Sequence, residues 1–301
     1  MSFSKRCKKE VLKKQPINTM AELLSVVFFI GSIRISNKGY KILFRTYSNT
    51  EARYIYNLIK DCYDYSSTFE IKDIDNEEKE RLFTVIIEEN DISEDIIEKS
   101  DRFFINTGAD LDDVSLEHIK AYLKIAFVFR GSVNDPQRGY NLEISVLDLD
   151  QSDLLSQCMD IFELNPKINK KKDSYIVYLK DSDKISDFLA IIEASKSLFE
   201  LENVRAMKSI RNNINRQTNF DKANIDRTVA ASVKQVDAIN LLISAGYFDS
   251  LSEDMKEIAS LRIDNPYASI EELGAMANPP MSKSKVNYRL QKFIKMAEEL
   301  S

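Results

Sequence analysis

Apolar and polar positions follow two different periods along the chain, and the change of period predicts two kinds of structure. Residues 23–30 and 123–129 are mostly apolar runs of helical length, and a glycine lies at or just after the end of each. Stretches such as 141–146 then alternate at every second position, which is typical of half-buried strands. From Leu198 onward the apolar residues recur at helical spacing instead. The pattern predicts an α+β region followed by an all-α region.

An internal repeat organises the α+β region. Gly31-Ser32 corresponds to Gly131-Ser132, and Gly39-Tyr40 corresponds to Gly139-Tyr140, at the same offset of 100 residues. Each copy predicts an apolar helix, a hairpin, a helix, two strands and a closing helix, so that the region reads αββαββα twice, over about 18–100 and 115–195. We expect a left-handed glycine cap at the end of each first helix. Because one unit covers a single face of its sheet, the two first helices are expected to pair.

The repeat also places the smaller elements. Hairpin turns are predicted at 37–39 and 135–139, and the middle helices at a cap on Thr50 and from about Gln151. The remaining strands are predicted around Phe69 and at 82–87, 167–169 and 175–179, and the closing helices near 93–98 and 182–192. Close pairing of the two first helices is favoured by small residues, which occur at Ala21, Ser25, Ala121 and Ala126. It is disfavoured by large side chains, which occur at Lys124, Phe129 and Arg130.

Residues 265–300 predict two short helices with a stiff turn between them. Ser269 can cap the first helix, whose apolar stripe would be Ile270, Leu273 and Met276. The prolines of Asn278-Pro279-Pro280 end that helix, because they remove backbone donors.

Ser282 can cap a second helix with two distinct faces. Its inward face would be Val286, Leu290, Phe293 or Ile294, and Ala297. Its other face is basic, without an acid between Met281 and Lys295: Lys283, Lys285, Arg289, Lys292 and Lys295. A cationic helix after such a turn is how a helix-turn-helix recognition helix meets DNA. The alternative is a solvated amphipathic helix that closes a small bundle.

A polar helical segment joins the two regions. Asparagines crowd its end at 212–219 and suggest a fraying, mobile junction before a further helix at about 224–245. We therefore expect a domain at 1–198, a linker helix at 199–222 and a helix-turn-helix domain at 223–301. Basic side chains here are either a polar linker surface or a secondary DNA contact: Arg205, Lys208, Arg211, Arg216 and Arg227.

Composition narrows the classes of protein. His118 is the only histidine and the three cysteines lack CxxC spacing, so a zinc site and a histidine-based triad are not expected. Neither a secretory pattern nor a membrane-length apolar run is present, and a cytoplasmic protein is expected. The net charge is −6, yet residues 196–301 hold fifteen basic and fourteen acidic residues, so a polyanion should meet the last third. Residues 2–14 form a basic helix, read as a solvated face or an auxiliary phosphate contact.

Several strings resemble the WhiA family of bacterial regulators. They are GSVNDPQRGYNLEIS from Gly131, YIVYLKDSDKISDFL, ENVRAMKSIRNNINR and NPPMSKSKVNYRL. The resemblance runs nearly end to end. It implies a degenerate LAGLIDADG homing-endonuclease-like domain joined to a carboxy-terminal helix-turn-helix, with a role in transcription, cell division and chromosome segregation.

The same resemblance bears on catalysis. An active LAGLIDADG endonuclease needs an acid immediately before each terminal glycine, where two carboxylates hold divalent metal at the scissile phosphates. Here those positions are Ile30 and Arg130. We expect no catalytic site, no metal and no cofactor. Asp148, Asp150 and Asp153 follow a strand and are read as a capping cluster.

The sequence thus predicts a non-enzymatic DNA-binding transcriptional regulator, nucleoid-associated and monomeric. The predicted DNA-binding residues are Ser282, Lys283, Ser284, Lys285, Asn287, Tyr288, Arg289 and Lys292. The open sheet faces, with Arg34, Lys41 and Arg45 in the first repeat and Lys170, Lys171 and Lys172 in the second, are read as solvated surface, weak DNA contact or a protein-partner surface. The rival functions are a scaffold of the division machinery that docks to the nucleoid, and a metal-dependent nuclease.

Overall fold

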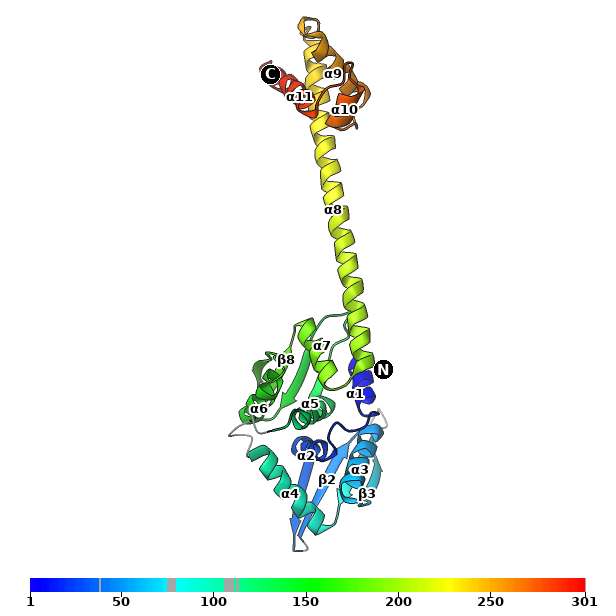
Figure 1. Ribbon diagram of the computed structural model, residues 1–301, viewed down its shortest axis with the longest axis vertical. Helices are drawn as coiled ribbons and strands as arrows, with labels where there is room; N and C mark the ends of the chain where they lie inside the picture. The colour runs from blue at the N-terminus through cyan, green and yellow to red at the C-terminus, as the bar shows by residue number, and fades with distance from the viewer. Residues whose placement is uncertain (38, 75–79, 106–110, 112–113, 301) are drawn as a thin grey trace. The chain divides into compact units, whose positions relative to one another are not determined.

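Two αββαββα repeats make up most of the first of two compact units in the computed structural model (Figure 1). The units comprise Met1–Met207 and Lys208–Ser301. The structure describes residues 1–37, 39–74, 80–105, 111 and 114–300. Within these ranges, no helix combines the length and the apolar content that crossing a membrane requires.

The first repeat follows the predicted order. Its elements are α2 (Thr19–Ile30), β1 (Gly31–Ser36), β2 (Gly39–Thr46), α3 (Asn49–Tyr63), β3 (Thr68–Asp73), β4 (Arg81–Ile87) and α4 (Asn90–Ile105). The antiparallel sheet has the strand order β1-β2-β4-β3, with Arg34 opposite Lys41 and Arg45 opposite Thr84. Lys38, in the predicted hairpin turn, lies outside the described residues.

The second repeat has the same topology. Its elements are α5 (Leu116–Arg130), β5 (Gly131–Val133), β6 (Leu142–Val146), α6 (Leu149–Asp160), β7 (Lys167–Lys171), β8 (Ser174–Leu179) and α7 (Ser182–Ile191). The sheet order β5-β6-β8-β7 matches that of the first repeat. A short helix, α1 (Phe3–Val11), precedes both repeats and packs on α5 and β5. The α+β class and the duplicated αββαββα order are confirmed.

Helices α2 and α5 pack against each other at the centre of this unit (Figure 1). Ala21, Ser25, Ala121 and Ala126 are all buried, as close helix pairing requires. The rings of Phe29 and Tyr122 lie 5.2 Å apart between centroids. Lys124 does not keep the helices apart, because its ammonium group is buried in an ion pair with Glu22. The expected pairing of the first helices is confirmed.

The glycines that end these helices do not form left-handed caps, contrary to expectation. Gly31 and Gly131 have φ of −65° and −92° and begin the next strands in extended conformation. A Cβ on either glycine would meet the backbone of the preceding helical turn, at Val27 and Phe127 respectively. Glycine is therefore required at both positions by the close approach of the backbone rather than by a positive φ.

Two helix starts differ from the prediction. Ser48 rather than Thr50 caps α3, and its side chain accepts a hydrogen bond from the backbone N–H of Glu51. Helix α6 begins at Leu149, because Asp148 caps it and accepts from Gln151 N at 2.8 Å. The capping role expected of the aspartate cluster is confirmed for Asp148.

The second unit is helical. It contains most of α8 (Ser195–Ser244), then a 3₁₀ turn η3 (Phe248–Ser250), α9 (Glu253–Asp264), α10 (Ile270–Met276) and α11 (Lys283–Glu298). Its core is apolar and drawn from all four helices, with the fully buried members Ile239, Ile258, Ala259, Leu273, Val286, Leu290 and Phe293.

Helix α8 is continuous, so the expected break between a linker helix and a second helix at about 224 is wrong. No glycine or proline lies between Pro166 and Gly246. An asparagine costs less than about 0.7 kcal/mol relative to alanine within a helix, and the flanking residues are good helix formers. All side chains from Arg211 to Phe220 are exposed.

Candidate nucleic-acid interface

The turn between α10 and α11 is fixed at both of its ends. Ser269 caps α10 in a capping box with Glu272, as its position predicts. The inward face of α10 is Leu273 and Gly274, whereas Met276 is 51% exposed and is not part of the expected stripe. This difference arises because α10 ends at Met276, where the chain turns away.

Gly274 allows the turn to close against α10. Met281 N donates to Gly274 O at 2.8 Å, and a Cβ on Gly274 would collide with the Met281 carbonyl oxygen. Glu257 of α9 accepts from Asn278 N at 2.6 Å and holds the middle of the turn. These contacts therefore fix the orientation of helix α11 relative to α9 and α10.

Helix α11 begins and packs as predicted. The Ser282 hydroxyl accepts a hydrogen bond from Lys285 N at 3.4 Å. Val286, Leu290, Phe293 and Ala297 are buried, and Phe293 rather than Ile294 occupies the inward position that the sequence leaves open.

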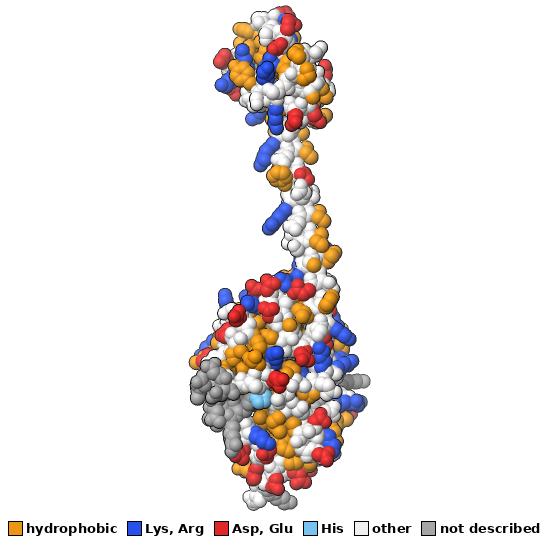
Figure 2. Space-filling view, viewed as in Figure 1, with side chains coloured by type: hydrophobic (Ala, Val, Ile, Leu, Met, Phe, Trp, Pro, Cys, Tyr) orange, Lys and Arg blue, Asp and Glu red, His pale blue; other side chains and the backbone are white. Residues whose placement is uncertain are grey.

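Seven of the eight predicted DNA-binding residues lie on the exposed surface of α11 and its cap. They are Ser282, Lys283, Ser284, Lys285, Asn287, Tyr288 and Lys292. Tyr288 is 70% exposed, so a large aromatic ring stands among the lysines. Figure 2 shows basic side chains gathered on this part of the unit. Because three ammonium groups share the surface with no acid on the helix before Lys295, it suits a polyanion.

Arg289 does not face outward, contrary to expectation. Its side chain is 17% exposed, and its guanidinium forms an ion pair with Asp254 of α9 and contacts the Met281 sulfur. Helix α11 packs on α9, which brings a first-turn carboxylate to the position that helical periodicity assigned to solvent. Arg289 therefore supports the orientation of α11.

The basic residues of α8 that were predicted as secondary DNA contacts also divide into paired and exposed side chains. Arg205 donates to Asp183 of α7 and to Glu202, and its side chain is 26% exposed, so it holds α8 on the second repeat rather than standing free. Lys208 is half-buried. Arg211, Arg216 and Arg227 are exposed.

A cavity of about 290 Å³ lies beside the start of α11. Arg227, Gln235, Arg262 and Lys283 contribute to its wall, together with the beginning of α10. Arg262 is 2% exposed and donates to the carbonyl oxygen of Ala268 at 2.7 Å, while its Nε and the Gln235 Oε1 have no hydrogen-bond partner within the described ranges. Burial lowers the pKa of the Arg262 guanidinium. The cavity gathers three cations and one carboxylate, that of Glu271, and this excess of positive charge suits a phosphate oxygen.

Sequence reasoning missed Arg262. Arg262 follows the buried Ile258 and Ala259 on α9 and precedes the turn after Asp264. In the sequence this is an ordinary position for a polar residue at a helix end. A basic residue in the last turn of a helix normally interacts with the carbonyl groups there, whereas Arg262 donates to carbonyl oxygens of the segment after the helix, at Asn265, Pro266 and Ala268. Residues of α8, which are distant in sequence, lie around it.

The sheet faces carry fewer free charges than the sequence indicates. Lys41 pairs with Glu88 at 3.0 Å, and Asn141 donates to Glu143 at 2.7 Å. Lys170 stacks over the Tyr175 ring, 5.6 Å from its centroid. Arg34 and Arg45 are exposed.

The two positions at which the resemblance implies acids in an active LAGLIDADG endonuclease are the last residues of α2 and α5. Ile30 is the final residue of α2, and Arg130 is the final residue of α5. Arg130 donates from Nη2 to the Phe29 carbonyl oxygen at 2.6 Å. A guanidinium thus satisfies a backbone carbonyl at the carboxyl end of the facing helix, where the helix dipole favours a cation.

Comparison with known proteins covers both units. Models for the WhiA N-terminal LAGLIDADG-like domain, the WhiA LAGLIDADG-like domain and the WhiA C-terminal HTH domain match residues 16–101, 119–211 and 214–297. The probable cell division protein WhiA of Clostridium beijerinckii is 35% identical over 311 residues, covering 100% of this chain and 99% of the relative. That of Clostridium tetani is 34% identical over 313 residues, covering 100% and 98%.

A solved structure shares the fold. The crystal structure of full-length DUF199/WhiA from Thermatoga maritima has a TM-score of 0.61 at 24% identity and covers 99% of both chains. The duplicated αββαββα repeats, the helical second unit and these matches agree, and the chain belongs to the WhiA family.

Proposed function

We propose that this protein is a non-enzymatic, nucleoid-associated transcriptional regulator that acts in bacterial cell division and chromosome segregation and binds duplex DNA through α11. The observation that carries the proposal is the exposed cationic surface of α11. Lys283, Lys285 and Lys292 are exposed, and no acid lies on the helix until after Lys295. The turn fixed by Gly274 presents that surface as one rigid face.

The residues divide into three roles. Ser282, Lys283, Ser284 and Lys285 lie at the amino end of α11, where backbone donors and the helix dipole favour a phosphate. Asn287 and Tyr288 lie further along the exposed face and are proposed to meet base edges or sugars, with Lys292 on the backbone beyond them. Arg289 is assigned to positioning α11 through Asp254.

The α8 residues extend this interface within the second unit. Arg227 shares a cavity with Lys283 and Arg262, so a phosphate held at the amino end of α11 would also meet Arg227. Arg211 and Arg216 are proposed as weaker backbone contacts because they are exposed on the same helix. Arg205 is left out, since its charge is already paired.

The test uses DNA sites that genome-wide mapping shows the protein to bind. The affinity for these sites is measured at a series of salt concentrations. Lys285→Ala should weaken binding to every sequence alike and lower the salt slope by about one unit, because a lysine that meets a phosphate carries no sequence information. Lys5→Ala removes the same charge from an exposed position on α1 and should change neither quantity. Val286→Asp places a charge in the second core and should abolish binding by unfolding that unit.

One observation favours a second function, a protein-interaction scaffold. Ile210, Ile214, Ile225 and Val229 recur at helical spacing on α8 and are 54%, 59%, 62% and 37% exposed. Exposed apolar side chains on one helix face are typical of a protein-binding surface. Sequence-specific protection of DNA by the purified protein distinguishes the regulator from a scaffold that only docks to the nucleoid.

A further inference from the structure

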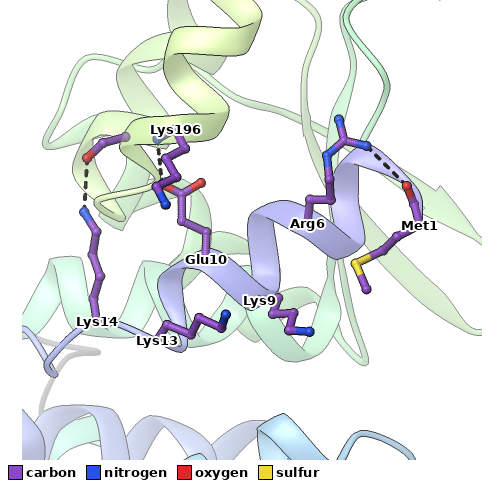
Figure 3. A pocket seen from close by; sticks show the side chains of 8 residues that line it. Met1, Arg6, Lys9, Glu10, Lys13, Lys14 and Lys196 are labelled. Atoms are coloured by element: carbon purple, nitrogen blue, oxygen red, sulfur yellow. Dashed lines mark hydrogen bonds between the residues drawn. The ribbon is translucent and has the colours of Figure 1, made fainter.

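A cavity of about 450 Å³ lies in the first unit, between α1 and the start of α8 (Figure 3). The charged side chains that line it are Arg6, Lys9, Glu10, Lys13, Lys14 and Lys196. Five of these side chains are cationic and one is a carboxylate, although the whole chain has a net charge of −6. The cavity is separate from α11 and its DNA-binding residues, which belong to the second unit.

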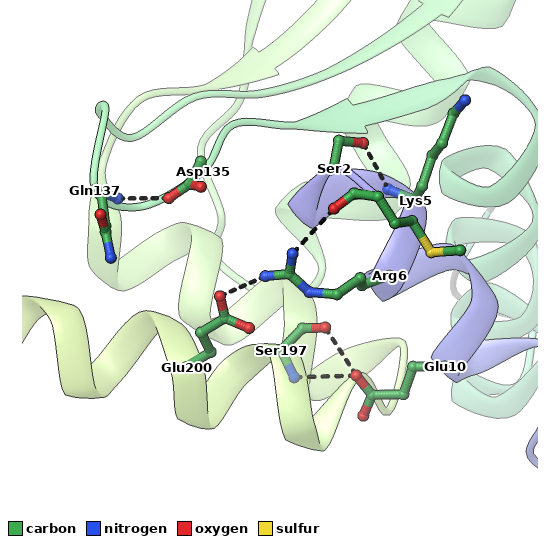
Figure 4. A network of polar contacts seen from close by, with 9 residues as sticks. Ser2, Lys5, Arg6, Glu10, Asp135, Gln137, Ser197 and Glu200 are labelled. Atoms are coloured by element: carbon green, nitrogen blue, oxygen red, sulfur yellow. Dashed lines mark hydrogen bonds and ion pairs between the residues drawn. The ribbon is translucent and has the colours of Figure 1, made fainter.

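Helix α1 is held firmly at this cavity (Figure 4). Glu10 accepts hydrogen bonds from the backbone N–H groups of Lys196 at 2.6 Å and Ser197 at 3.0 Å, so it caps the first turn of α8. Arg6 pairs with Glu200 at 2.5 Å, and Ser4 Oγ accepts from Val133 N at 3.2 Å. The one carboxylate of the cavity and one of its cations therefore have partners already.

The remaining cations have no acidic partner in the part of the chain that the structure describes. Within the described ranges, Lys9, Lys13 and Lys196 form no ion pair, and Lys14 donates only to Ser195 Oγ, at 3.1 Å. Lys9 lies in the last turn of α1 and Lys13 in the turn that follows the helix, and both line the cavity, so their like charges repel each other. An anion that bridges them would remove this repulsion, and Lys196 approaches from the opposite wall (Figure 3).

We propose that this cavity binds linked phosphate groups through Lys9, Lys13 and Lys196, with Lys14 as a further donor. A ligand with a single carboxylate would leave most of the positive charge of the cavity uncompensated. Two or more linked phosphates match several ammonium groups at once. The volume lies in the range of small-molecule sites. The same chemistry is found in a free oligophosphate and in the backbone of a nucleic acid, and the experiment below separates the two sources.

The test uses the full chain and inorganic tripolyphosphate, measured by isothermal titration calorimetry at about 150 mM salt, where weak surface electrostatics are screened. Lys9→Gln, Lys13→Gln and Lys196→Gln are combined in one variant. The matched control combines Lys5→Gln, Lys171→Gln and Lys172→Gln, which removes the same charge from exposed positions outside the cavity. We expect the first variant to bind at least about tenfold more weakly than the wild type and the control to bind normally. Thermal denaturation confirms that both variants are folded.

A second arm measures duplex DNA binding by the same three proteins. If the cavity holds a free oligophosphate, the duplex neither displaces tripolyphosphate nor loses affinity in the cavity variant. If it holds the nucleic-acid backbone, the duplex displaces tripolyphosphate and the salt slope falls by about three units in the cavity variant alone. Either result supports the site. Equal binding of both ligands by the cavity variant and the control overturns the proposal, and leaves the proposed function of α11 unaffected.

Discussion

The ammonium group of Lys124 lies 2.9 Å from the Glu22 carboxylate, and both side chains are buried where α2 packs on α5. Lys124 also donates to the Tyr54 hydroxyl at 2.9 Å, and Tyr54 in turn donates to Glu22. A third contact, from Ile17 N to Glu22 at 2.7 Å, completes the carboxylate's environment. The helix pair is thus joined by a hydrogen-bonded charge pair as well as by apolar contacts.

Removing one member of this pair should destabilise the first unit strongly. We expect Lys124→Met and Glu22→Gln each to lower the free energy of unfolding by about 3–5 kcal/mol, because each leaves a buried charge without its partner. The double variant should recover much of the loss, since glutamine can still accept from Ile17 N and Tyr54. Urea unfolding followed by circular dichroism measures all three. Single variants within about 1 kcal/mol of the wild type would contradict a buried charge pair.

The ion pair between Arg289 and Asp254 should make a measurable contribution to the stability of the second unit. Arg289→Ala and Asp254→Ala should each lower its stability by about 1 kcal/mol or less, and the double variant should lose no more than either. Melting curves test this double-mutant cycle. DNA affinity separates the two roles of the arginine. If Arg289 instead pairs with a guanine edge, its replacement costs ~1–3 kcal/mol at one base position and Asp254→Ala strengthens binding.

Gly274→Ala should disrupt the turn before α11. The added methyl group meets a backbone carbonyl oxygen, that of Met281, which cannot move without displacing the turn. We expect a loss of about 1–3 kcal/mol in stability, with DNA affinity reduced at temperatures where the unit remains folded. Met276→Ala, on the exposed side of the same helix, is the control and should have little effect.

The two units are expected to separate on limited proteolysis. Cleavage should begin within 212–219, where every side chain of α8 is exposed and local opening therefore breaks few contacts. Mass spectrometry of the first fragments locates the site. If the protease cuts the αββαββα repeats first and leaves 212–219 intact, the domain boundaries proposed from the sequence are wrong.

Neither the wild type nor Ile30→Asp should cleave duplex DNA with Mg²⁺ or Mn²⁺. The substitution supplies one carboxylate, but Arg130 at the end of the facing helix repels a divalent cation. A plasmid-nicking assay with and without chelator provides the measurement. Chelator-sensitive nicking by the wild type would instead favour the nuclease reading.

The fold was predictable because its signals are local or repeated. The paired Gly-Ser and Gly-Tyr motifs set the two αββαββα units in register, and Ser269 and Ser282 marked the helix starts through capping chemistry. The start of α3, which the sequence analysis misplaced, also depends on local signals. Ser48 and Thr50 are both favourable cap residues by type, with serine preferred to threonine, and the extended backbone at Ser48 makes it the cap.

The contacts that change the roles of charged residues were not predictable. Lys124 and Glu22 are 102 positions apart, and Arg289 and Asp254 are 35 apart, so no helical or strand period relates them. An arginine on a helix is expected to be solvated unless a carboxylate from another element meets it. Helix packing provided such carboxylates for Arg205 and Arg289, and left Lys285 and Tyr288 exposed.

The hydrogen bond from Arg130 to the Phe29 carbonyl also limits how this domain can change by mutation. An acid introduced at Ile30 alone would lie beside a guanidinium and form an internal ion pair instead of a metal ligand. An acid introduced at Arg130 alone would remove the donor that satisfies Phe29 and set a negative charge at the end of a helix dipole. Each single step towards a nuclease is therefore unfavourable, and the two acids would have to arise together. The side chain at one of these two positions is thus itself a contact between the paired helices.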